Sequence, residues 1–340
     1  MRFEFYHAGL DNVPKLSVDG TVSNSIHFSH WEGNQTPDEV KADTSTEIAL
    51  NLVASPNKQK LTQGIELVTN NHFDTDGVLS VWTVLNGERA RDLREQLIPA
   101  AEAGDFSEFS TETGVRASIV IQGSEQASPN NEPGSPLAAY LAGKEISDDA
   151  EAYELVLPEV ERVLRNTGDY ESLWRSGWEA IASAIESFEK GESKVEEHQD
   201  VHLSLITLAP EVFSPIGFNP TRHVAPYTAI SRYARGQIFL IATPFRDEWA
   251  YRIDYPYYSW AETVVRPGVK RHDFGALILQ LNQIEQNHDG RWKLDNSEMT
   301  SVVKFLDPSN TLAASKLRPD ELVSLMRAEL LSKNAARVWV

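Results

Sequence analysis

Residues 64–77 have the sequence Gly64-Ile65-Glu66-Leu67-Val68-Thr69-Asn70-Asn71-His72-Phe73-Asp74-Thr75-Asp76-Gly77. The apolar alternation between Gly64 and Asn71 predicts a β-strand, and Gly77 predicts a turn after it. Residues 78–86 then place apolar side chains at helical spacing, which predicts a packed helix. A strand followed by a helix is the repeating unit of an α/β domain.

Neighbouring segments extend this pattern. Residues 26–30 predict a second strand. Thr36-Pro37-Asp38-Glu39 and Thr44-Ser45-Thr46-Glu47 both place Thr three residues before Glu, which is the capping box that starts a helix. Residues 88–103 predict a further helix that ends at Gly104. We therefore expect an α/β domain with a parallel sheet at the N-terminus.

A chain of 340 residues favours two domains. We expect an α/β domain over residues 1–195, with a helical insertion at 148–189, and a smaller mixed α+β domain over 200–340. The short, charged segment 190–199 is the predicted boundary, and residues 123–136 predict a long loop. The predicted elements of the second domain are strands at 202–208 and 302–306, a hairpin at 237–255, a short helix at 226–234, and helices from 273 and from 319 to 333.

The composition excludes several classes of protein. A formal net charge of −19 disfavours binding to duplex DNA or to an anionic membrane. No stretch approaches the roughly 18 apolar residues of a membrane span. The first residues lack the pattern of a secretion signal, so we expect a cytoplasmic protein. The absence of cysteine excludes disulfides and thiolate metal sites, so any metal must bind oxygen and imidazole ligands.

The chemistry is expected at the end of the first strand quoted above. His72, Asp74 and Asp76 alternate, and alternate side chains of an extended backbone point to the same side. Open α/β sheets bind ligands beyond the carboxyl ends of their strands. The helix after Gly77 would present its N-terminal amides at the same place, which favours a phosphate group. The three residues therefore predict a divalent-metal site.

Three interpretations of this segment differ in chemistry. A calcium loop of the EF-hand type is excluded, because aligning Gly77 with its invariant glycine places His72 first and Thr83 twelfth, where acids are needed. Residues 73–79, Phe-Asp-Thr-Asp-Gly-Val-Leu, resemble the hallmark of haloacid-dehalogenase-type phosphatases. That resemblance implies Asp74 as a covalent nucleophile and Asp76 as its acid/base.

The third interpretation includes the histidine. His72-Phe73-Asp74-Thr75-Asp76-Gly77, with Ser80 in the following helix, resembles the first motif of the DHH phosphoesterase superfamily over about 20 residues. This superfamily includes single-strand exonucleases, nanoRNA hydrolases and inorganic pyrophosphatases. The resemblance implies that His72, Asp74 and Asp76 bind a Mn²⁺ or Mg²⁺ pair, with phosphoester hydrolysis by a metal-bound water. Two ions about 3.5–4 Å apart stabilise both the attacking and the leaving oxygen.

The sequence departs from that superfamily elsewhere. The Asp-His-His triplet and the Gly-Gly-Gly-His signature are absent, and residues 287–292, Asn-His-Asp-Gly-Arg-Trp, are the nearest segment to the latter. A non-catalytic metal- or nucleotide-binding protein with a degenerate site is therefore a further alternative. Residues 29–37 and 43–47 also resemble a bacterial family of unknown function.

Other residues are candidates for the remaining ligands. Asp105 follows a predicted helix and is the first candidate. His223 begins a basic segment and is expected to bind metal or phosphate. His30, at the end of a strand, and Asp43, before a capping box, are weaker candidates. The triplet His198, Asp200 and His202 precedes a strand, which places it at the wrong edge of a parallel sheet.

The second domain contains a basic segment. Between residues 220 and 272 there are eight Arg and Lys and four Asp and Glu, a local charge of +4. The resemblance implies that this domain holds substrate phosphates, and Arg252, Arg266 and Arg271 suit that task through the bidentate guanidinium. We expect a small phosphorylated substrate or a short single-stranded oligonucleotide, with Mn²⁺ or Mg²⁺ as cofactor and a possible homodimer.

Overall fold

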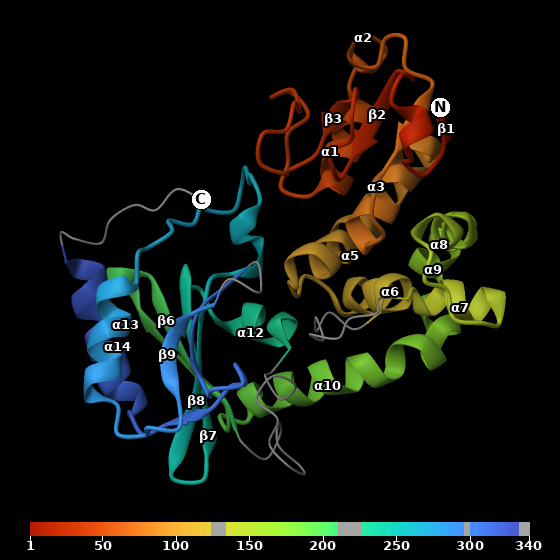
Figure 1. Ribbon diagram of the computed structural model, residues 1–340. Helices are drawn as coiled ribbons and strands as arrows, with labels where there is room; N and C mark the ends of the chain where they lie inside the picture. The colour runs from red at the N-terminus through yellow and green to blue at the C-terminus, as the bar shows by residue number, and fades with distance from the viewer. Residues whose placement is uncertain (124–133, 210–225, 296–299, 333–340) are drawn as a thin grey trace. The chain divides into compact units, whose positions relative to one another are not determined.

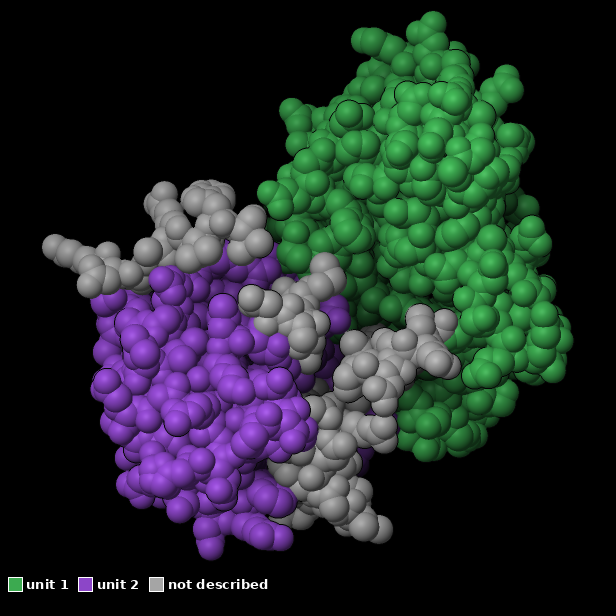
Figure 2. Space-filling model, in the orientation of Figure 1, with its two compact units in different colours: residues 1–179, 260–268 green, residues 180–259, 269–340 purple. Residues whose placement is uncertain are grey.

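The structure is a computed structural model that describes residues 1–123, 134–209, 226–295 and 300–332. The chain forms two compact units, residues 1–179 with 260–268 (unit 1) and residues 180–259 with 269–340 (unit 2), coloured separately in Figure 2. Residues 260–268, which we call the strap, belong to unit 1 although the residues before and after them in sequence belong to unit 2.

Unit 1, in which Figure 1 labels β1, β2 and β3, contains a four-stranded parallel sheet with the strand order β1-β4-β2-β3. The strands are β1 (Arg2–Phe3), β2 (Lys15–Val18), β3 (Ile26–Phe28) and β4 (Leu67–Thr69). Because all four strands are parallel, their carboxyl ends lie at one edge of the sheet. The segments that follow β2, β3 and β4 therefore meet there.

Helices make up most of the rest of unit 1. They are α1 (Ser45–Ala54), α2 (Lys58–Leu61), α3 (Thr75–Asn86), α4 (Glu88–Asp92), α5 (Arg94–Phe106), α6 (Glu112–Gln122), α7 (Pro136–Ala142), α8 (Asp149–Val156), α9 (Val160–Arg165) and the first part of α10 (Glu171–Glu189). The predicted capping box is confirmed in α1, where the Thr44 side chain accepts the Glu47 N–H at 3.2 Å. Every residue of α3 from Thr75 to Val84 is buried, so α3 is the central helix of this unit.

Three local predictions are wrong. No helix starts at Thr36, because its hydroxyl donates to the carbonyl of Ser29 (2.7 Å) and accepts the Ser29 N–H (2.9 Å) instead of capping a helix. The predicted helix 88–103 is interrupted at Leu93, and its second part, α5, ends at Phe106 instead of Gly104. Residues 72–76 are not extended throughout, because α3 begins at Thr75 with Asp74 as its N-cap.

Unit 2 contains a seven-stranded mixed sheet with the order β5-β6-β7-β8-β10-β9, and β11 pairs with β8. The strands are β5 (Lys194–His198), β6 (Leu203–Thr207), β7 (Ile238–Phe245), β8 (Glu248–Asp254), β9 (Arg291–Leu294), β10 (Ser301–Leu306) and β11 (Ala314–Ser315). The predicted hairpin is the antiparallel pair β7–β8. Unit 2 also contains the second part of α10 and the helices α12 (Tyr227–Tyr233), α13 (Gly275–Ile284) and α14 (Pro319–Leu331).

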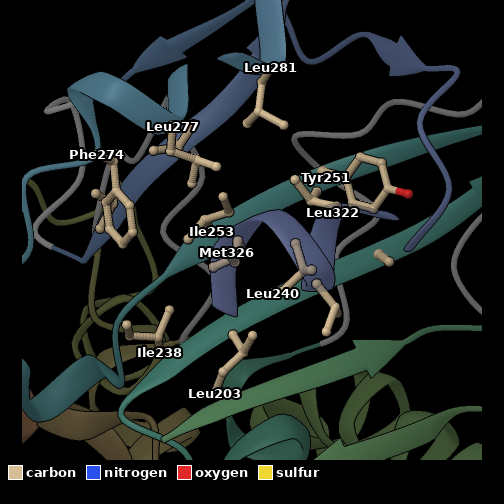
Figure 3. Close-up of a cluster of buried hydrophobic side chains, with 14 of the residues drawn as sticks. Leu203, Ile238, Leu240, Tyr251, Ile253, Phe274, Leu277, Leu281, Leu322 and Met326 are labelled. Carbon is tan, nitrogen blue, oxygen red and sulfur yellow. The ribbon is translucent and has the colours of Figure 1, made fainter. Parts of the chain in front are cut away.

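The core of unit 2 lies between the sheet and α13 and α14. Figure 3 shows Leu240 and Ile253 of the sheet against Leu277 of α13 and Met326 of α14, all buried. The predicted α/β fold class, with a parallel N-terminal sheet and a mixed C-terminal sheet, is confirmed. Within the described ranges, no helix combines the length and apolar character that crossing a membrane requires.

Candidate metal centre

Five acidic and imidazole side chains meet at the carboxyl edge of the sheet of unit 1. Asp19 directly follows β2, His30 lies two residues after β3, and the loop after β4 carries His72 and Asp74. Asp76 is in the first turn of α3. The short strands thus bring together residues that are up to 57 positions apart, as expected for the ligand edge of an α/β sheet.

One group of these side chains is partly exposed. The Nε2 atom of His72 lies 3.1 Å from Asp74 Oδ2 and 3.3 Å from Asp19 Oδ2. The other carboxylate oxygen of Asp74, Oδ1, accepts the Gly77 N–H at 2.7 Å and so caps α3. That hydrogen bond holds Oδ2 toward His72. The His72 and Asp74 side chains are 30% and 21% exposed, so this group is open to solvent.

A second group is buried. His30 Nε2 lies 3.6 Å from Asp19 Oδ1, and the side chains of both residues are at most 1% exposed. Asp76 completes the group, whose ligand atoms lie within 4.8 Å of one another. Both oxygens of Asp76 accept backbone N–H groups from the start of α1, Ser45 at 2.7 Å and Thr46 at 2.8 Å. Helix α1 therefore fixes the orientation of Asp76.

Asp19 is common to both groups. Its Oδ1 faces His30 and its Oδ2 faces His72, so one carboxylate joins the two sets of side chains. Asp105, in the last turn of α5, adds a further carboxylate, because its Oδ2 lies 3.2 Å from His30 Nε2. This arrangement fits two cations that share one carboxylate.

The hydrogen bond of the other ring nitrogen fixes the tautomer of His30. Nδ1 lies 2.7 Å from the backbone carbonyl oxygen of Asp43, which only accepts, so Nδ1 carries the proton. In a neutral ring, Nε2 then presents a lone pair to the carboxylates of Asp19 and Asp105. Within the described ranges, His30 Nε2 and Asp105 Oδ2 are among the buried atoms that have no hydrogen-bond partner. Acceptors that face one another in a buried site need a proton or a cation between them.

Burial in this crowded group also shifts the pKa values of Asp76, Asp105 and His30. Burial, with the charge of Asp19, raises the pKa of Asp76 and of Asp105 well above the usual range of carboxyl groups. Burial also favours the neutral form of His30 and lowers its pKa. Without a metal, these two carboxyl groups therefore hold their protons to a higher pH than ordinary carboxyl groups, and a cation would compete with those protons.

The pKa values of Asp19 and His72 are shifted in opposite directions. Burial acts to raise the pKa of Asp19, but its contact with His72 and the nearby imidazole charges lower it to about 2. Burial acts to lower the pKa of His72, but the charges of Asp74 and Asp19 raise it to about 12. Without a metal, a protonated His72 occupies the position of a cation between these two carboxylates.

The sequence model of DUF6687, a family of unknown function, matches residues 2–324. The chain belongs to this family. Comparison with curated proteins gives no match. Among solved structures, this member of DUF6687 is similar to the pGpG-specific phosphodiesterase PggH from Vibrio cholerae, with 10% sequence identity and a TM-score of 0.34 over 93% of this chain and 83% of that chain. A likeness at this level supports no statement about activity.

The basic residues that were predicted to bind substrate are divided between the two units. Arg266 belongs to the strap of unit 1, while Arg252 and Arg271 belong to unit 2. Arg252 Nε donates to Asp254 at 3.1 Å, and the Arg271 guanidinium lies 4.4 Å from the centroid of the Tyr255 ring. His223 lies outside the described residues. Their contacts with a substrate remain predictions.

The histidine-rich segment around β5 lies in unit 2. His198 ends β5, and His202 precedes β6 with a left-handed backbone conformation, φ 53°. Asp200 makes an exposed ion pair with Arg327 at 2.7 Å. Unit 1 therefore supplies all the residues of the two Asp/His groups that the described part of this DUF6687 chain contains.

Asp19 was not among the site residues predicted from the sequence. Residues 16–20, Leu-Ser-Val-Asp-Gly, carry the same signal as the loop after β4, because an apolar strand ends in an aspartate followed by glycine. The strand has four residues, Lys15–Val18, and includes a buried lysine, so it lacks a clear apolar alternation. Applying the strand-end rule to this shorter segment would have found it.

Proposed function

We propose that this chain is a divalent-metal-dependent phosphoesterase related to the DHH superfamily. It would bind one cation between His72, Asp74 and Asp19, and a second between His30, Asp76 and Asp19, with Asp105 as a further ligand. The observation that carries the proposal is the buried Nε2 lone pair of His30, which faces the carboxyl groups of Asp19 and Asp105, so that a proton or a cation is required between them.

The residues present fit such a pair of ions. The four carboxyl groups of Asp19, Asp74, Asp76 and Asp105 carry a total charge of −4 when ionised, which two divalent cations offset. The donors are carboxylate oxygens and imidazole nitrogens. This mixture suits Mn²⁺ better than Mg²⁺, which prefers oxygen ligands and retains its waters.

The side chains of the two groups differ in solvent accessibility, so we assign a different role in binding to each group. When bound, the cations supply Lewis acidity to a phosphoryl group. The partly exposed His72 and Asp74 lie at the solvent-accessible side, so the scissile phosphate would enter there. Asp19 keeps the two groups in a fixed relation, because each of its oxygens faces one histidine. Asp76 is held by two amides of α1 and orients the buried group.

An aromatic side chain beside the open group supports a substrate with a planar group. The Trp31 ring lies 5.8 Å from the ring of His72, centroid to centroid, and 5.2 Å from that of Trp260. Trp31 is only partly buried. Nucleobases stack on such side chains in proteins that bind single strands. A short oligonucleotide or a dinucleotide therefore fits the proposal, whereas the net charge of −19 disfavours long duplex DNA.

The test is hydrolysis of bis-p-nitrophenyl phosphate, dinucleotides and pyrophosphate by the Mn²⁺-loaded protein. We expect Mn²⁺-dependent turnover of at least one of these, lost in His30→Gln and kept in His7→Gln, a matched change at a histidine whose side chain is 58% exposed. Bound Mn²⁺ without turnover would favour the non-catalytic alternative. A beryllium fluoride adduct on Asp74 would favour the covalent phosphatase mechanism instead.

A further inference from the structure

Asp43 anchors the strap within unit 1. Its Oδ1 accepts the backbone N–H groups of Val264 and Val265, the latter at 2.8 Å. Its Oδ2 accepts the N–H of Arg266 at 2.9 Å and the Nη1 of the same residue at 2.8 Å. The Asp43 side chain is 1% exposed, so this carboxylate is fully used in holding the strap.

Arg266 links the strap to two further acids. Its Nη2 donates to Glu102 in α5 at 2.7 Å and to Glu108, just after α5, at 2.6 Å. Its Nε donates to Glu108 as well, at 3.0 Å. The guanidinium also lies 4.9 Å from the centroid of the Phe106 ring. One cation thus holds three carboxylates, a task that needs the fork of donors in arginine.

Asp43 also contacts His30, the buried histidine of the metal centre. The backbone carbonyl of Asp43 accepts the proton on His30 Nδ1, at 2.7 Å. The strap contacts His30 in two more ways, because the Glu262 N–H donates to the His30 carbonyl at 2.7 Å and the Trp260 ring meets the imidazole edge-on at 5.0 Å. The orientation of this imidazole therefore depends on the strap.

We propose that Arg266 is a positioning residue of the metal centre, which acts through Asp43 to direct Nε2 of His30 at the buried cation. This inference rests on the proposed function, because it requires a cation between His30, Asp19 and Asp76. Without the guanidinium, the acids of Asp43, Glu102 and Glu108 repel one another. The Asp43 carbonyl then shifts, and the proton of His30 loses its fixed acceptor. This role differs from the phosphate binding expected from the sequence.

The experiment compares Mn²⁺ binding in the wild type, Arg266→Gln and Arg266→Lys. Arg89→Gln is the matched control, since Arg89 pairs with Glu161 on the surface of unit 1. We expect two ions in the wild type and in the control. In Arg266→Gln one ion should bind at least about tenfold more weakly, as for other losses of groups that orient metal ligands, while the second is unchanged. Arg266→Lys should be intermediate, and it carries the test if the glutamine variant does not fold.

Two further measurements separate positioning from general damage. In a double-mutant cycle, Arg266→Gln should weaken Mn²⁺ binding in the wild type but not in a His30→Gln background, because both changes affect the same ligand. In the metal-free protein, ¹⁵N NMR should show His30 as the Nδ1–H tautomer in the wild type and as a mixture of tautomers in Arg266→Gln. Arg89→Gln should leave the tautomer unchanged.

Other outcomes would overturn the inference. Unchanged binding of two ions in Arg266→Gln, with a raised KM for substrate, would assign Arg266 to phosphate binding. Additive effects in the cycle, or an unchanged tautomer, would also exclude a role through Asp43. If the wild type binds no ion, the proposed function fails, whereas the tautomer measurement still reports on the link between Asp43 and His30.

Discussion

Asp19 Oδ2 lies 3.3 Å from Nε2 of His72, although the two residues follow different strands and are separated by 53 positions. The second oxygen of Asp19 faces His30 at 3.6 Å. One short side chain thus determines the relation between an open and a buried group of ligands. Both groups of ligands in the metal centre therefore depend on Asp19.

Asp19→Asn should disable both cation sites. The amide keeps the size of the side chain but replaces one oxygen ligand with a donor, so both groups lose a charge and one loses a ligand. We expect activity to fall by more than the roughly 10- to 100-fold that follows loss of an outer-shell group. Isothermal titration with Mn²⁺ should show loss of two ions. The control Asp38→Asn, at a side chain that is 95% exposed, should bind both.

Asp105→Asn should stabilise the metal-free protein while weakening metal binding. Burial and the charge of Asp19 raise the pKa of Asp105, so the folded state binds its proton more tightly than the unfolded state does. Its contribution to stability is complete below the unfolded pKa of about 3.9 and is lost as the pH rises through the folded pKa. An amide carries no charge and takes up no proton on folding, so the variant should have a higher unfolding free energy than the wild type at neutral pH.

Denaturant unfolding with a chelator present checks this prediction. The wild type should lose stability as the pH rises above about 4, and the variant should lose less. Asp92→Asn, an exposed change in α4, should follow the wild type. A variant that is less stable than the wild type without metal would show that Asp105 has a structural partner and not a repulsive environment.

Metal binding should release protons. The pKa values of Asp76 and Asp105 are raised by burial and by the charge of Asp19, and that of His72 is raised to about 12 by its acidic neighbours. His72 is therefore protonated at neutral pH without metal, Asp76 and Asp105 hold their protons to a higher pH than ordinary carboxyl groups, and a cation must displace the protons that are bound. The affinity for Mn²⁺ should rise with pH. Calorimetry in buffers with different ionisation enthalpies measures the number released, and a value of zero would contradict these pKa shifts.

Much of this centre was predictable, because local rules govern the segments that form it. The capping box at Thr44 and the strand before His72 follow from patterns within a few residues, and both are present. The structure also brings Asp105 and His30 to the centre, as their positions at element ends suggested. The position of a residue at the end of a strand predicts at which edge of the sheet its side chain lies.

The pairing of these residues was not predictable. Alternation suggested that Asp74 and Asp76 act together, but helix α3 starts between them and turns Asp76 toward α1. Asp74 instead faces His72. The three acids around Arg266 are 158 to 223 positions away in sequence, so their contact is a product of tertiary packing alone. Local sequence patterns do not indicate which distant residues will be in contact.

Gly77→Ala should disturb the open group through a steric clash. A Cβ at this position would lie 2.7 Å from Asn70 Nδ2, 2.8 Å from the Tyr153 hydroxyl and 3.0 Å from Asp74 Oδ1. The cap of α3 must then shift, and we expect a loss of about 1–3 kcal/mol of stability together with weaker Mn²⁺ binding. Thermal unfolding and a Mn²⁺ titration measure the two effects.

Adding Tyr153→Phe should restore part of the stability lost in Gly77→Ala, because it removes one of the atoms that the new Cβ meets. The control Gly168→Ala places its Cβ in open space in the same unit and should have little effect. If Gly77→Ala behaved like this control, the close packing around Asp74 would not be required for the centre.

Anomalous diffraction at the manganese edge, on crystals soaked in Mn²⁺, tests the central claim most directly. We expect two ions, one on either side of the Asp19 carboxylate and about 3.5–4 Å apart, with one next to His72 and the other next to His30. Manganese bound elsewhere, or no manganese with the imidazole of His30 hydrogen-bonded to a protonated Asp105, would contradict it.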